Sequence, residues 1–119
     1  MKHVPAALLF LSATLPAPSR AIHADAEADI PAGAFTTHYR CQAAARDGFL
    51  SRDRAALCSA AFLRVKLHFV ADVAPELFST LPPKARAAAS RTGYLAFKDW
   101  EADNPEAAHR LSQGPATAL

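Results

Sequence analysis

Cys41 and Cys58 are the only cysteines of this 119-residue sequence, and two chemistries are open to them. Together with His38, one helical turn before Cys41, and with His68, they offer the mixed nitrogen and sulfur ligands of a metal site. However, the paired cysteine spacing of a zinc finger is missing, and so are the Cys-x-x-Cys motif of thiol exchange and the Cys-x-x-Cys-His motif of haem attachment. Because the N-terminus has the pattern of an export signal, an even cysteine count favours a disulfide. We predict a Cys41–Cys58 bond and no metal or cofactor.

Nucleophilic catalysis has no supporting motif in this chain. A serine or cysteine nucleophile needs a histidine and an orienting acid, and the Gly-x-Ser-x-Gly elbow that holds a serine in place is missing. His23, His68 and His109 lie in separate segments. Solvation and the helix dipole explain the acids between residues 101 and 106, and glycine is too scarce for a phosphate-binding loop. We therefore predict that the protein is not an enzyme.

Two groups of large apolar side chains are candidates for binding a protein partner. The helix expected after Ser51 has one broad apolar face and a second apolar stripe nearly opposite it, which suits a central helix or one that shows a side to a partner. A later segment places three aromatic rings at three-residue spacing, and aromatic side chains beside charges are enriched in binding hot spots. For Phe97 and Trp100, packing in the core is the favoured interpretation and a partner surface is the alternative. The candidate partner surface comprises Leu63, Leu67, Val70, Tyr94, Phe97 and Trp100.

Capping residues and helix breakers divide the chain into helical segments. Ser51 is a good N-cap with Asp53 in the first turn behind it, Asn104 before Pro105 is a second helix start, and Gly48 can end a helix. In the third helix, small side chains such as Gly93 form a stripe that lets another helix approach closely. The predicted helices span about residues 37–47, 51–73, 83–101 and 105–113, with Thr36 or Thr37 capping the first.

The cysteines lie symmetrically about the break between Gly48 and Ser51. In an antiparallel helical hairpin, residues equidistant from the turn face each other, so the two sulfurs can meet. The closed loop would stabilise the fold by about 3 kcal/mol in the chain-entropy model. Since no stretch alternates with period two, we predict an all-α fold. It is a small three- to four-helix bundle with a disulfide-stapled N-terminal helical hairpin.

Residues 1–21 have the features of a cleavable signal peptide. Lys2 precedes an apolar stretch, and Ser19 and Ala21 occupy the small-x-small positions before the cut. The apolar stretch has about a dozen residues, well short of the ~20 that span a bilayer. We predict export to the periplasm or the exterior, a flexible acidic leader at residues 22–35, a single helical domain at residues 36–114 and a frayed tail at residues 115–119.

Charge argues against two classes of partner. The sequence has 13 Lys and Arg against 11 Asp and Glu, and loss of residues 1–21 removes Lys2 and Arg20, which leaves a nearly neutral chain. We therefore expect neither nucleic acid nor an anionic membrane as partner, and no membrane span. The expected function is that of an exported noncatalytic interaction protein of the bacterial cell envelope or exterior, of the inhibitor, immunity, accessory or subunit type. The alternative is a small-ligand or metal carrier with a pocket between helices.

Overall fold

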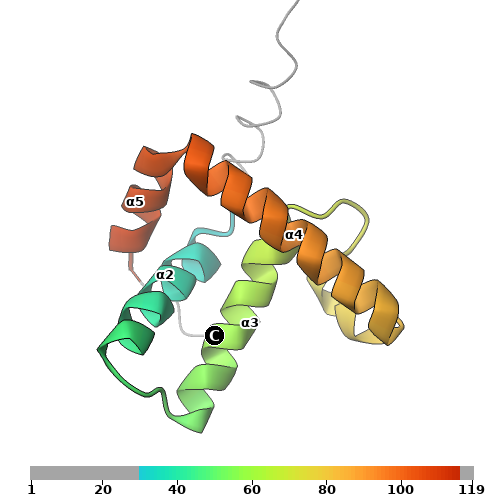
Figure 1. Ribbon diagram of the computed structural model, residues 1–119, viewed down its shortest axis with the longest axis horizontal. Coiled ribbons are helices and arrows are strands. Elements are labelled where there is room, and N and C mark those ends of the chain that lie inside the picture. Colours follow the sequence, from blue (N-terminus) through green and yellow to red (C-terminus); the bar gives the residue numbers. More distant parts are fainter. Residues whose placement is uncertain (1–29, 116–119) are drawn as a thin grey trace, which may run out of the picture.

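The computed structural model describes residues 30–115, and the predicted all-α fold is confirmed. In Figure 1, α2 and α3 form an antiparallel pair, α4 crosses one end of that pair, and α5 lies beside α2. The described elements are α2 (Ala32–Asp47), α3 (Arg52–His68), the 3-10 helix η1 (Pro75–Thr80), α4 (Pro83–Asp103) and α5 (Pro105–Gln113). None of these helices has the length and hydropathy needed to cross a membrane. The predicted signal peptide and most of the predicted leader lie outside the described residues.

The first helix of the pair begins at Ala32, five residues before the predicted start. The Pro31 carbonyl accepts a bond from the Ala34 amide at 2.9 Å, and Phe35 is completely buried. Thr36, predicted as the cap, is instead buried within the helix and donates its hydroxyl to the Leu111 carbonyl of α5. Burial of an aromatic ring stabilises a fold by a few kcal/mol, which draws residues 32–35 of the predicted leader into the packed domain.

The second helix ends at His68, five residues before its predicted end. The amides of Phe69 and Val70 bond to carbonyls three residues back, those of Lys66 and Leu67, so the last turn tightens. The Phe69 ring packs against the core. After α3, Asp72 has a positive φ of 67°. The chain then enters η1 at Pro75, in the segment where the sequence indicated a short turn.

The main core lies where α2, α3, α4 and α5 meet. Its buried members are Ala34, Phe35, Val65, Phe97, Trp100, Ala107 and Ala108. The Phe35 ring makes edge-to-face contacts with Phe97 and Trp100, at centroid distances of 5.9 and 5.5 Å. Such ring pairs contribute about 0.5–1.5 kcal/mol beyond the area they bury.

The small-residue stripe of α4 is confirmed as a packing surface. Ala89 and Gly93 are buried where α4 crosses α3. A Cβ atom at Gly93 would lie only 2.2 Å from the carbonyl oxygen of Lys66, so only glycine permits this approach. Next to the crossing, the Lys66 ammonium donates a hydrogen bond to the Ser90 hydroxyl at 2.7 Å.

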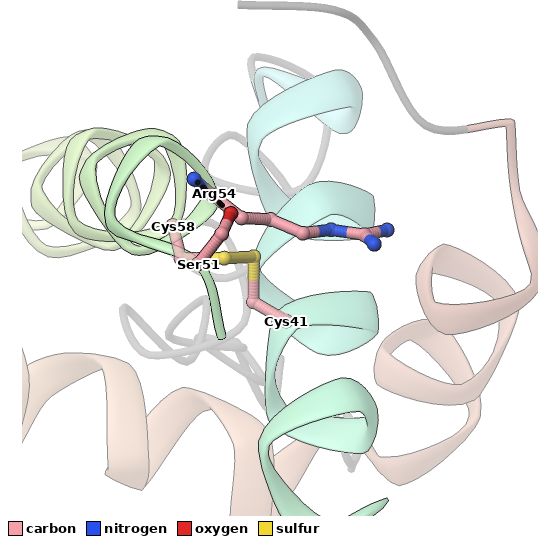
Figure 2. The surroundings of a disulfide bond; sticks show 4 residues. All are labelled: Cys41, Ser51, Arg54 and Cys58. Atoms are coloured by element: carbon pink, nitrogen blue, oxygen red, sulfur yellow. Dashed lines mark hydrogen bonds between the residues drawn. A yellow bond between two sulfur atoms is a disulfide. The ribbon is translucent and has the colours of Figure 1, made fainter. Parts of the chain in front are cut away.

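The predicted Cys41–Cys58 disulfide is confirmed and joins α2 to α3, with 5.8 Å between the Cα atoms (Figure 2). Ser51 caps α3 as predicted, because its hydroxyl accepts a bond from the Arg54 amide at 3.2 Å. Asn104 behaves differently from the prediction: its side-chain amide donates to the Trp100 carbonyl at 2.8 Å, so it closes α4. The following helix still begins at Pro105.

Candidate functional site

Three of the six predicted surface residues are core residues. Leu67, Phe97 and Trp100 are 3%, 1% and 2% exposed, so the core interpretation holds for them and they do not face a partner. The close crossing of α4 over α3 at Gly93 brings the inner face of α4 against the core, and this crossing is a tertiary feature that residue spacing does not reveal.

The other three predicted surface residues reach the surface to different degrees. Leu63 and Val70 are half-buried on α3 and just after it, whereas Tyr94 on α4 is 43% exposed. The six side chains therefore do not form one continuous surface, and only Tyr94 remains as a large exposed member.

Tyr94 instead contributes to a groove between α2 and α3 with a volume of about 440 Å³. The groove is lined by His38, Cys41, Gln42 and Ala45 of α2, by Ala55, Cys58, Ser59 and Phe62 of α3, and by Leu50 and Tyr94. Each helix contributes residues spaced i, i+3, i+4 and i+7, which is one helical face. The disulfide joins these two faces, so the groove lies along the stapled side of the hairpin.

Sequence reasoning missed this groove, although a signal was present. Once a disulfide is predicted between two helices, the residues that share a face with each cysteine must face the opposite helix or line the gap beside it. Applying the helical period to both cysteines identifies His38 and Ala45 on one helix and Ala55 and Phe62 on the other. The missing step was to list the residues that share a helical face with each cysteine and to predict that they line one groove.

His38 is the buried polar group of the groove. Its residue is 5% exposed, its ring stacks on Phe62 with a centroid distance of 4.4 Å, and its edge meets Phe97 at 5.5 Å. Burial lowers the pKa of the His38 imidazole below its ordinary value, and the positive charges of Lys98 and Lys66 lower it further, against an opposing effect of Glu101. Within residues 30–115, Nε2 has no hydrogen-bond partner. Burial in the groove therefore favours the neutral form of the His38 imidazole.

Charged and phenolic groups lie near His38 and Phe62 of the groove lining. The Tyr39 hydroxyl donates to Glu101 at 2.9 Å, and the Lys98 ammonium bonds the other carboxylate oxygen at 2.6 Å. Burial and this bond to Glu101 raise the pKa of Tyr39, and the bond to Glu101 raises that of Lys98. The Lys66 ammonium lies 4.6 Å from the centroid of the Phe62 ring, and burial lowers its pKa.

The four side chains considered for a metal site do not form one. The two sulfurs are bonded to each other, and His38 stacks on Phe62. Among the residues that the structure describes, no three His, Cys, Asp or Glu side chains gather as a metal-binding group.

Comparison with known proteins gives no further guide to this site. No family model matches the chain, and neither a curated protein nor a solved structure matches it. The function is therefore argued from the residues of the groove itself.

Proposed function

We propose that this protein is an exported noncatalytic interaction protein of the bacterial cell envelope or exterior, and that it binds a protein partner in the groove between α2 and α3. The observation that carries the proposal is an apolar groove on the stapled side of the hairpin, whose inner wall at Phe62 packs against the aromatic core. Exposed concave apolar surface is typical of binding sites rather than of surface that serves stability.

Aromatic side chains at both ends of the groove support this function. Phe49 is fully exposed in the α2–α3 turn, directly before Leu50 of the groove lining. Tyr94 also lines the groove and comes from α4, which crosses the hairpin at the end away from the α2–α3 turn (Figure 1). Aromatic rings at an interface supply large contact area at low entropic cost, and they dominate binding hot spots.

The disulfide supports the proposal through the rigidity of the site. Cys41 and Cys58 line the groove and fix the spacing of the helices on either side of it. A groove that keeps its shape in the free protein loses less conformational entropy when a partner binds.

Site-specific photo-cross-linking in the producing cell tests this function. A photoreactive amino acid replaces Gln42 or Tyr94 in the groove, and the controls carry it at the exposed positions Ala102 or His109 of α4 and α5. We expect one protein cross-linked from both groove positions and from neither control position. Equal yields from all four positions, or products from the controls alone, would contradict the proposal.

Export is part of the proposal and depends on residues 1–21, which lie outside the described residues. Intact-mass measurement of the protein recovered from the periplasm or the medium tests it. We expect an N-terminus at Ile22, within a few residues, and retention of Met1 in that fraction would contradict export.

A second candidate function, carriage of a small apolar ligand, is favoured by the buried Nε2 of His38. Among residues 30–115 this atom has no partner, and ligand pockets combine an apolar lining with a few polar groups at volumes of about 300–1,000 Å³. Native mass spectrometry of the exported protein tests this candidate. A bound small molecule that is lost from a Ser59→Trp variant would support it, and an unliganded mass would argue against it.

A further inference from the structure

We infer that the partner presents an acidic segment with an apolar side chain to the groove between α2 and α3. This inference rests on the proposed function and adds the chemistry of the partner. It follows from where the charges of the α2–α3 hairpin lie relative to the groove lining.

Basic side chains lie on the faces of α2 and α3 that line the groove. Arg46 follows Gln42 by four residues, and Arg52 precedes Ala55 by three. Residues three or four apart in a helix lie on the same face, so both arginines flank the lining. Lys66 follows Phe62 by four residues, and its ammonium lies 4.6 Å from the Phe62 ring centroid.

The acids of the same hairpin lie on other faces of their helices. Asp47 follows Ala45 by two residues, and Asp53 precedes Ala55 by two. Residues two apart do not face the same way, so these carboxylates point away from the lining. Between Ala32 and His68 the sequence carries six Arg and Lys against two Asp, and four of the six remain beside the groove because Arg40 and Arg64 lie two residues from lining positions and face away. The near-neutral charge of the whole chain therefore conceals a basic groove.

Basic side chains also flank the part of the groove that Tyr94 of α4 lines. On α4, Arg91 precedes Tyr94 by three residues and Lys98 follows it by four. The acid nearest to this end is Glu101, whose two oxygens already accept bonds from Tyr39 and Lys98. Because Lys98 is paired with Glu101, Arg91 is the basic side chain left at this end, while Arg46 and Arg52 flank the other end. Complementarity therefore requires acidic residues beside the partner's apolar anchor.

The composition of the groove lining favours a protein partner over other anionic molecules. The groove walls carry no ionised side chain among the described residues, and Phe62, Leu50 and Tyr94 offer surface for an apolar side chain. Nucleic acid would need phosphate contacts along the groove instead. A second copy of this chain would bring an equally basic face, so symmetric pairing through the groove places like charges together.

Two synthetic helical peptides test the inference on the mature chain by fluorescence anisotropy. Both carry one Leu and Phe stripe, and they differ only in having Glu or Lys at the remaining positions. We expect the Glu peptide to bind about tenfold more tightly at low salt. The difference should vanish near 1 M NaCl, where the Debye length is about 3 Å.

Charge-reversal variants locate the effect. Arg46→Glu and Arg52→Glu should each weaken binding of the Glu peptide about tenfold. Arg64→Glu makes the same charge change at an exposed position two residues from Phe62, and should change the affinity by less than about twofold. Circular dichroism melting of all three variants confirms that the helices remain folded. Equal losses in all three would show a net-charge effect and overturn the inference.

The remaining outcomes separate the inference from the proposed function. Equal, salt-independent binding of both peptides overturns the acidic partner and leaves the groove as a binding site. Binding of phosphatidylglycerol vesicles without binding of either peptide overturns the inference in favour of a lipid surface. If neither peptide binds, the acidic partner is rejected, and the cross-links from Gln42 and Tyr94 decide the proposed function independently.

Discussion

Gly93 of α4 lies directly against the Lys66 carbonyl of α3, with 2.2 Å between that oxygen and the position a Cβ at Gly93 would take. This approach sets the crossing of the two helices, and it brings Tyr94 to the groove while Phe97 and Trp100 enter the core.

Gly93→Ala should therefore destabilise the protein, although alanine is the better helix former. The added methyl group pushes α4 away from α3, and overpacking of this kind costs about 1–3 kcal/mol. Urea denaturation measures the loss. Gly48→Ala is the matched control, since no described atom lies within 4 Å of its Cβ and its φ of 163° suits any residue. Equal effects of the two substitutions would contradict the close crossing.

Leu67→Asp should unfold the protein. Leu67 is buried, so the variant places an unpaired carboxylate in an apolar site, at a cost of several kcal/mol that is a large part of the stability of a small domain. Leu57→Asp on the same helix is the control, because Leu57 is exposed and should tolerate the charge. Thermal melting by circular dichroism distinguishes the two, and a folded Leu67→Asp protein would restore the predicted partner stripe.

Local signals predicted much of this fold, and long-range contacts account for the errors. Ser51, Pro83 and Pro105 mark helix starts through capping and backbone geometry, which act within one turn. The early start of α2 depends on burial of Phe35 against rings some sixty residues later, which no local pattern contains.

At the candidate site, too, local sequence signals were sufficient for some features, and long-range contacts decided the others. The disulfide could be predicted because its evidence was the symmetry of two cysteines about one turn. Core packing was the favoured interpretation for Phe97 and Trp100, but their three-residue spacing with Tyr94 is compatible with both core and surface until the crossing at Gly93 is known.

Acid should destabilise the protein through His38. Its pKa is lowered in the folded state, so below about pH 6.5, the ordinary value for an unfolded histidine, the unfolded chain binds the proton more readily. Stability is then full above this pH and falls as the pH decreases. Urea midpoints at about pH 7.5 and about pH 5.5 should differ, and His38→Phe should reduce the difference. The control His109→Gln changes an exposed histidine and should not. An unchanged pH dependence in His38→Phe would contradict this role.

Removal of the disulfide should weaken the hairpin. The cysteines are 17 residues apart, and loss of a loop of this size costs about 3 kcal/mol in the chain-entropy model. The double variant Cys41→Ser with Cys58→Ser should therefore melt at a lower temperature than the oxidised protein. Nonreducing peptide mapping checks the bond itself. Free thiols or an intermolecular bond as the main species would contradict the stapled hairpin.

The most direct test of partner binding in the groove between α2 and α3 is the yield of the protein cross-link from Gln42 when that groove is filled. Ser59→Trp places an indole on the lining, whereas Ala60→Trp adds the same side chain one position later, on an exposed face outside it. We expect the cross-link to disappear in Ser59→Trp and to persist in Ala60→Trp, with both variants folded. Equal cross-linking in the two variants would show that the partner does not bind in the groove.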